Sequence, residues 1–205
     1  MRMFKVPGIL YYIFNRFLWR VPVKDNSIFL TFDDGPSGDL TLWILDLLDK
    51  YNAKATFFCV GEKILANKAY YDKIVERGHL TANHTFSHEH FRDVSVKTYL
   101  HSIQKCGELV NSRLFRPPYG RVRPRIAKMI KRAGFKPVMW SVLSYDYDQE
   151  MSPGKILRKI VRQTKPGSII VFHDNKKATR NIQIVLPRYL AFFANKGFKF
   201  KVLPH

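Results

Sequence analysis

The chain has 205 residues, a length that fits one folded domain with a sizeable core. Apolar residues make up 46% and charged residues 25%, which excludes a disordered chain, and two cysteines are too few for a disulfide framework. The formal net charge of +19 favours contact with a polyanion, whether a glycan, an anionic lipid or a nucleic acid, without choosing among them.

Residues 1–24 are predicted to form an N-terminal arm that packs on the domain after it. The apolar run at 9–14 is too short for a signal peptide or a transmembrane helix, and Asn15 and Arg16 interrupt it. The aromatic and basic residues of the arm would also suit a segment at a membrane interface. We expect a cytoplasmic or membrane-peripheral protein, and the cell envelope is the alternative compartment.

Short apolar runs alternate with amphipathic segments through residues 25–205, the predicted catalytic domain. Strands are expected at residues 27–32, 55–60, 80–83, 137–142 and 168–172. Helices are expected at residues 44–51, 70–77, 95–111, 124–133, 153–163 and 181–196. This alternation is typical of βα units, so the sequence predicts an α/β fold with parallel strands and reactive side chains after their carboxyl ends.

Polar residues do follow the predicted strands. Asp33 and Asp34 follow the first strand, and His84 and His88 follow the third at a spacing that places both imidazoles on one helical turn. Two histidines and one carboxylate, Asp34 or Asp33, would leave open positions for water and substrate, as catalytic metal sites do. The alternatives are solvent-facing histidines and a helix-capping aspartate pair. We interpret three further histidines as non-ligands: His79, His90 and His101.

Four motifs, in order and spacing, resemble those of the polysaccharide deacetylase family, the NodB homology domain of carbohydrate esterase family 4. They are residues 31–36 (Thr-Phe-Asp-Asp-Gly-Pro), 83–88 (Asn-His-Thr-Phe-Ser-His), 116–120 (Arg-Pro-Pro-Tyr-Gly) and His173. The resemblance covers about residues 25–203. It implies a distorted (β/α) barrel of mostly parallel strands. It also implies a metal-dependent hydrolase that removes N-acetyl groups from a peptidoglycan-like or chitin-like glycan.

The resemblance also implies roles for single residues. One divalent ion is expected, zinc first and cobalt or manganese as alternatives. Asp33 would be the general base, oriented by Arg116, and His173 the general acid that protonates the departing amine. Amide hydrolysis needs these parts, because the attacking water must lose a proton and the amine must gain one. The implied metal ligands are Asp34, His84 and His88.

The loops would supply the substrate contacts. The backbone N–H of Tyr119, in the loop stiffened by Pro118, would stabilise the oxyanion. We expect Tyr119 and Tyr145 to line the site, and we count Pro118 and Asp146 with them among the oxyanion and substrate residues. In the family an aspartate holds the acid histidine, but Leu143 stands at that position here. The partner of His173 is therefore left open between Asp146 and Asp148.

Three alternatives to the deacetylase stay open. A hydrolase of the same fold could act on O-acetyl esters or small non-peptide amides. A carbohydrate-binding member without activity would be favoured only by Leu143. A nucleic-acid-binding module is suggested only by the charge, and no specific nucleic-acid partner is expected. The expected partner is an N-acetylated glycan, with peripheral contact to an anionic polymer or membrane surface.

Overall fold

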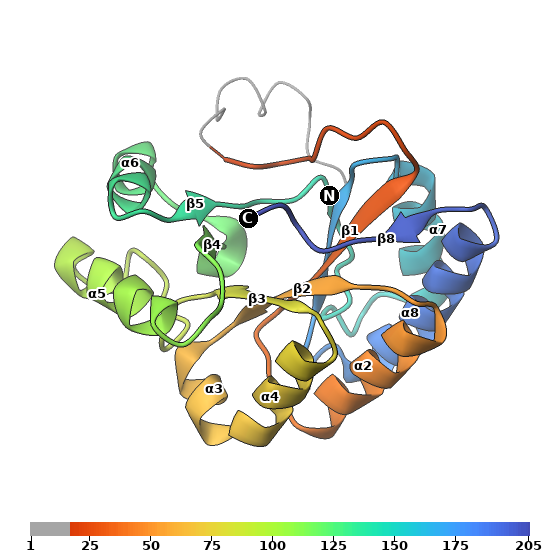
Figure 1. Ribbon diagram of the computed structural model, residues 1–205, viewed down its shortest axis with the longest axis horizontal. Coiled ribbons are helices and arrows are strands. Elements are labelled where there is room, and N and C mark those ends of the chain that lie inside the picture. The colour runs from red at the N-terminus through yellow and green to blue at the C-terminus, as the bar shows by residue number, and fades with distance from the viewer. Residues whose placement is uncertain (1–16) are drawn as a thin grey trace.

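A curled parallel sheet forms the centre of the computed structural model, which describes residues 17–205 (Figure 1). The strands are β1 (Ser27–Asp33), β2 (Ala55–Cys59), β3 (Leu80–Asn83), β4 (Leu114–Phe115), β5 (Lys136–Pro137), β6 (Val142–Leu143), β7 (Ile169–His173) and β8 (Lys199–Phe200). Their order is β5-β4-β3-β2-β1-β7-β6, and β8 pairs with the start of β1. All these strand pairs are parallel, which confirms the predicted α/β class in the form of an open half-barrel.

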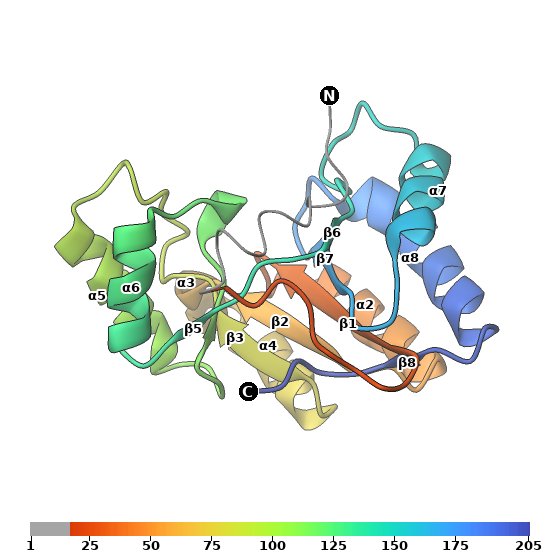
Figure 2. The same ribbon diagram turned by 90° about the horizontal axis from the view of Figure 1, so that it is seen from above.

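Helices follow most strands and cover the outside of the sheet. They are α2 (Asp39–Lys50), α3 (Gly61–Ala66), α4 (Lys68–Glu76), α5 (Val96–Gly107), α6 (Pro124–Arg132), α7 (Pro153–Gln163), α8 (Thr179–Ala194) and the short 3-10 helix η1 (Pro118–Gly120). Figure 2 shows α5 and α6 on one side of the sheet and α7 and α8 on the other. The six predicted helices are present, and all but α7 have shifted ends, whereas α3, η1, β4 and β8 were not predicted. Within residues 17–205, no helix has the length and apolar character needed to cross a membrane.

Strand β1 lies near the middle of the sheet, and all seven of its residues are buried. Phe32 stacks on Phe57 of β2 and on Phe172 of β7, with ring centroids 5.0 and 6.0 Å apart. A parallel strand covered on both faces is apolar throughout, as the sequence of β1 is. The aromatic packing holds the carboxyl ends of the three strands together, where the chemistry-bearing residues follow.

The prediction of one strand over residues 137–142 was wrong, because two strands share this segment. β5 pairs with β4 at one edge of the sheet, and β6 pairs with β7 at the other. Residues 138–141 cross the open side between the two edges, and Val138 forms a bridge with Leu18 there. Most residues of this segment are buried, which explains its apolar sequence. Apolar character predicts a strand, but it does not show that the two ends of the segment pair with different strands.

Residues 17–24 of the predicted N-terminal arm pack against the domain. The backbone N–H of Leu18 donates to the carbonyl of Pro137 at 2.9 Å, and that of Val21 donates to the carbonyl of Gly167 at 2.9 Å. Phe17 and Val21 are buried. Residues 1–16, which carry the rest of the predicted arm and the interfacial interpretation, lie outside the described residues.

Candidate active site

The predicted site residues meet at one edge of the sheet. Asp33 ends β1 and His173 ends β7, and the two are directly paired in the register of these strands. His84 and Arg116 follow β3 and β4, which are also neighbours. Carboxyl ends of parallel strands point in the same direction, so the loops that follow them share one rim.

A cavity of about 660 Å³ opens at this rim. Tyr119 lines it, as predicted, whereas Tyr145 is not among its lining residues and packs against the main hydrophobic core. Pro118 and Asp146 are buried beside the cavity and do not line it. The residues that line it are Asp33, Asp34, His84, His88, His90, Pro117, Tyr119, Gly120, Arg121, Trp140, Leu143, Tyr147, Val171, His173, Asn175 and Lys177.

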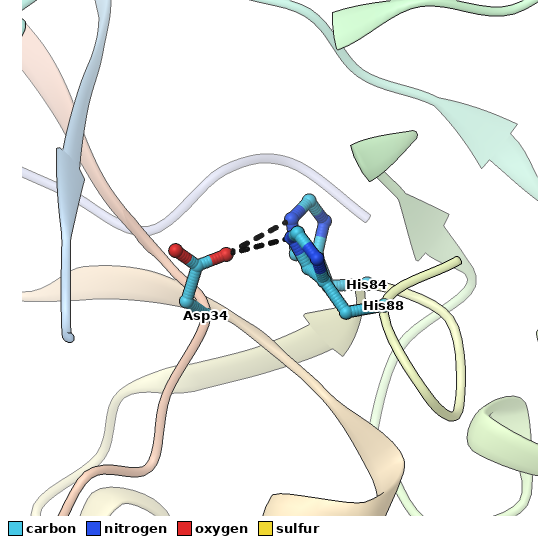
Figure 3. Close-up of side chains that lie close together, drawn as sticks. All are labelled: Asp34, His84 and His88. Atoms are coloured by element: carbon cyan, nitrogen blue, oxygen red, sulfur yellow. Dashed lines mark ion pairs between the residues drawn. The ribbon is translucent and has the colours of Figure 1, made fainter. Parts of the chain in front are cut away.

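Three side chains in this cavity form a cluster suited to a metal ion (Figure 3). Oδ1 of Asp34 lies 3.4 Å from Nε2 of His84 and 3.0 Å from Nε2 of His88. One donor atom from each residue lies within 4.8 Å of the others. Two imidazole nitrogens and one carboxylate oxygen are the ligand types of a catalytic zinc site. The donor set therefore fits a divalent ion.

Neighbouring groups orient this cluster. Nδ1 of His84 lies 2.8 Å from the carbonyl oxygen of Arg116, and a carbonyl can only accept, so Nδ1 donates to it and Nε2 is the nitrogen that faces the cluster. The side-chain amide of Asn175 donates to Oδ2 of Asp34 at 2.6 Å. Burial raises the pKa of Asp34, but its hydrogen bonds with His84 and His88 outweigh burial and hold that pKa well below its usual range.

The expected helical turn from His84 to His88 was wrong, because this segment is a loop. Thr85 and His88 have positive φ angles of 66° and 58°, which no right-handed helix allows. The Asn83 side chain accepts from the Thr85 N–H at 2.9 Å, and the Ser102 hydroxyl accepts from the Phe86 N–H at 2.8 Å. Side chains thus satisfy backbone groups that a helix would use, and the loop brings both histidines to Asp34.

Asp33 and Arg116 form a buried ion pair beneath the cavity. Nη1 of Arg116 lies 2.6 Å from Oδ1 of Asp33 and 2.7 Å from the hydroxyl of Thr31. Arg116 is fully buried, and its guanidinium lies 4.0 Å from the ring centroid of Phe58. Burial lowers the pKa of Arg116 while Asp33 raises it. The positive charge of Arg116 offsets the negative charge of Asp33. This weakens the repulsion between the adjacent carboxylates of Asp33 and Asp34 at the end of β1.

His173 is held by Asp146, which decides between the two partners left open by the sequence. Nδ1 of His173 lies 2.7 Å from Oδ1 of Asp146, and the His173 backbone N–H donates to Oδ2 at 2.8 Å. A carboxylate only accepts, so Nδ1 is protonated and Nε2 is left for the cavity. Burial lowers the pKa of His173, but the Asp146 carboxylate outweighs it and raises this pKa to about 9.

Backbone strain concentrates at the rim. Among residues 17–205, most non-glycine residues with positive φ lie in loops of this site: Asp34, Thr85, His88, Tyr119 and Tyr145. Such conformations cost free energy and occur mainly where surrounding structure enforces them for function. The ring of Tyr119 is 62% exposed and contacts His88 and His90 edge-on, with centroids 5.0 and 5.3 Å away.

Several cavity residues were not predicted. Asn175, which holds Asp34, follows β7 by two residues, in the type of loop where the strand-end argument could have placed it. His90 was interpreted as a non-ligand; it lines the cavity but is not part of the ligand cluster. Asparagine and histidine are common in ordinary loops, so neither residue stands out without its neighbours in space.

This half-barrel gathers a possible metal site, a carboxylate and a histidine in one cavity, which are the groups that a metal-dependent hydrolase uses. The chain matches the family model described as polysaccharide deacetylase over residues 20–138. The chain belongs to the polysaccharide deacetylase family, as the motifs predicted. Deacetylases of this family are generally metal-dependent, and the cluster is a possible site for the ion.

Individual relatives agree with this assignment. The chain is 32% identical over 189 residues to a peptidoglycan-N-acetylglucosamine deacetylase of Bacillus cereus, covering 89% of this chain and 88% of that one. It is 33% identical over 162 residues to a chitooligosaccharide deacetylase of Azorhizobium caulinodans, covering 76% and 77%. The crystal structure of the Bc1960 peptidoglycan N-acetylglucosamine deacetylase superposes with a TM-score of 0.83 at 28% identity, covering 95% and 94%.

Proposed function

We propose that this chain removes N-acetyl groups from amino sugars of a glycan, peptidoglycan-like or chitin-like, and releases acetate. The observation that carries the proposal is the juxtaposition of Asp33 and His173, paired across neighbouring strands, with a possible metal site in the same cavity. A carboxylate base and a histidine acid are the two proton-transfer groups that amide hydrolysis requires. The names of the similar deacetylases support an N-acetylated glycan as substrate.

The proposed metal ligands are Asp34, His84 and His88, with zinc as the expected ion and cobalt or manganese as alternatives. Their two imidazole nitrogens suit zinc better than magnesium or calcium, which prefer oxygen ligands. When bound, a divalent ion polarises the acetyl carbonyl and lowers the pKa of a water molecule. The hydrogen bonds from Asn175 and to the Arg116 carbonyl set the orientation of the ligands before any ion binds.

Proton transfer is assigned to two residues with opposite tasks. Asp33 accepts a proton from the attacking water, and Arg116 holds its carboxylate in place through a 2.6 Å hydrogen bond. His173 donates the proton that the departing amine needs, from Nε2, because Nδ1 is committed to Asp146. The raised pKa of about 9 keeps His173 protonated, and thus able to act as an acid, at neutral pH.

The remaining cavity residues suit an acetylated sugar. The backbone N–H of Tyr119 is the proposed donor to the oxyanion. Leu143 and Val171 both line the cavity and give the acetyl methyl group an apolar wall. This explains how a leucine can stand where the family has an aspartate, since Asp146 supports His173 from beneath.

The basic surface points to where the enzyme works. With 35 lysines and arginines against 16 aspartates and glutamates, the chain attracts anionic polymers such as cell-wall glycan, and it suits peripheral contact with an anionic membrane surface. A cell-envelope location would bring such a polymer and an N-acetylated glycan together, and a cytoplasmic or membrane-peripheral location is the alternative.

Acetate release from N-acetylglucosamine oligomers and from peptidoglycan tests the proposal. We expect release by the purified protein, loss after chelation and recovery when zinc or cobalt is returned. Asp33→Asn should bind the metal as the wild type does, yet lose at least about a hundredfold in kcat. Release only from O-acetylated glycans would replace the amide with an ester as substrate. A chain that binds no metal would contradict the enzyme and favour the carbohydrate-binding alternative.

A further inference from the structure

Two cationic side chains that line the cavity, Arg121 and Lys177, form no ion pair with a carboxylate among the described residues. Arg121 and Lys177 both line it, and both are exposed. Residues 1–16 contain no acidic residue, so every aspartate and glutamate lies in the described part of the chain. There, the lysines and arginines within ion-pair distance of a carboxylate are Lys54, Lys68, Arg77, Arg116 and Lys201. The charges of Arg121 and Lys177 are therefore available to a ligand.

The two cations lie on opposite sides of the ligand cluster. Arg121 directly follows η1, in the connection from β4 to α6, and Lys177 lies in the connection from β7 to α8. In the sheet, β4 and β7 are separated by β3, β2 and β1, which position His84 and Asp34. Figure 2 shows α6 and α8, the helices that follow the two connections, on the two sides of the sheet. Four strand spacings separate β4 from β7, roughly 19 Å along the curled sheet.

The acidic residues of the cavity do not offset these cations. Asp33 and Asp34 are its only acidic lining residues. Asp33 is paired with the buried Arg116, and Asp34 is committed to the two histidines. An approaching glycan therefore meets a positive potential on both sides of the reacting sugar, and a cavity with walls of low dielectric concentrates that potential.

We propose that the substrate is an anionic glycan, with a carboxylate or phosphate on sugars flanking the acetylated one, and that Arg121 and Lys177 select it. This inference rests on the proposed deacetylase function and adds a substrate class to it. Arg121 can grip a carboxylate or phosphate with two parallel N–H donors, whereas Lys177 offers a point charge. A neutral chitin-type chain would leave both cations without a partner.

Three substrates of equal length separate the possibilities. They are a neutral N-acetylglucosamine tetramer, a tetramer whose alternate sugars carry lactyl carboxylates, and an N-acetylglucosamine tetramer with a terminal phosphate. The measured quantity is the ratio of kcat/KM for each charged tetramer to that for the neutral one. We expect at least one ratio well above unity for the wild type, and the larger ratio identifies the anion. Equal values for all three tetramers would overturn the inference while leaving deacetylation of the neutral tetramer intact.

Charge-removing variants test the two residues. Arg121→Gln and Lys177→Gln should each lower the ratio about threefold to fivefold, the scale of an exposed ion pair, and the double variant should lower it further. Arg125→Gln and Lys176→Gln remove the same charges from exposed neighbours that do not line the cavity, and should keep the wild-type ratio. Equal loss in the control pair would show that only the overall charge matters and would refute a cavity-specific role.

A binding measurement separates this inference from the proposed function. In an Asp33→Asn background, which slows turnover at least about a hundredfold, the Kd of each of the three tetramers is measured with and without the Arg121→Gln and Lys177→Gln substitutions. Weaker binding of the charged tetramers alone supports the inference even if acetate release fails. Unchanged Kd values for all three tetramers would contradict it even if acetate release succeeds.

Discussion

Asp146 holds the ring of His173, a task that the family motif would give to position 143. Leu143 occupies the place where the family carries the aspartate that holds the acid histidine, and the sequence left Asp146 and Asp148 as replacements. In the structure Asp146 is fully buried and contacts both the ring and the backbone of His173. Its other support is the Ser144 hydroxyl, which donates to Oδ1 at 2.8 Å. The support for His173 thus comes from the same loop by a different residue.

We predict that Asp146→Asn moves the alkaline limb of the kcat–pH profile to lower pH. The Asp146 carboxylate raises the pKa of His173 to about 9, so the wild-type acid stays protonated below that pH and loses activity above it. Without this charge, burial lowers the pKa, and the limb should shift by roughly one to three pH units. The check is kcat against pH on a neutral oligomer. Asp148→Asn serves as the control and should leave the limb in place; an unshifted limb in Asp146→Asn would contradict the assignment.

Asn175 is the residue-scale feature that the sequence did not reveal. Its amide donates to Oδ2 of Asp34, which leaves Oδ1 directed at the two histidines. We predict that Asn175→Ala weakens zinc binding about tenfold to a hundredfold, as loss of a group that orients a metal ligand generally does. Competition with a chromophoric chelator measures this affinity. Asn195→Ala, at an exposed position after α8, is the control; equal affinity in both variants would refute a positioning role for Asn175.

At the scale of elements, loops rather than helices and strands decide the site geometry. The strands bring Asp33 and His173 into register, but the proposed metal ligands Asp34 and His88 have left-handed backbone conformations within loops. The loop after β4 has the same character, because both Tyr119 and Gly120 have positive φ. The periodicity of apolar residues predicts helices and strands, but it does not predict the backbone conformation of loop residues.

We predict that Gly120→Ala lowers both stability and kcat/KM. A Cβ at Gly120 would lie 2.1 Å from Cη2 of Trp140, which also lines the cavity, so the ring or the Tyr119 loop must move. Gly134→Ala is a matched control, because its φ is also positive and a Cβ there meets nothing within 4 Å. The control should lose only about 1–2 kcal/mol of unfolding free energy from backbone strain. Denaturant unfolding and steady-state kinetics compare the two, and equal effects would contradict the steric explanation.

At the scale of the whole molecule, charge is the dominant property. The +19 net charge attracts an anionic polymer from a distance, before any contact in the cavity forms. Such attraction acts over the Debye length, which is about 10 Å at 0.1 M salt and about 3 Å at 1 M. Long-range attraction to a polymer and local selection at Arg121 and Lys177 are therefore separable by salt and by substitution.

We predict that kcat/KM on an anionic glycan falls steeply as salt rises from about 0.05 to about 0.5 M, because screening removes the attraction. The neutral tetramer should show little change over the same range. Initial rates at low substrate concentration measure both. An identical salt response of anionic and neutral substrates would exclude electrostatic steering.

The sequence alone determined the class of fold and the family, and it supplied the candidate site residues that the structure brings to one cavity. Alternating apolar runs predicted parallel βα units, because buried strands and amphipathic helices leave distinct periodicities. The motifs placed Asp33, Asp34 and His173 after strand ends, where parallel sheets carry their chemistry. These features involve residues that are close together in the sequence, so they can be recognised from the sequence of one protein.

Only the tertiary structure decided which distant residues of the site are neighbours in space. It joined His173 to Asp146, oriented Asp34 through Asn175, divided residues 137–142 between two sheet edges, and set Arg121 and Lys177 on opposite sides of the cavity. These arrangements depend on the curl of the sheet and on loop conformations with positive φ. Such contacts leave no periodic pattern in the sequence, because packing among distant segments selects them only once the chain has folded.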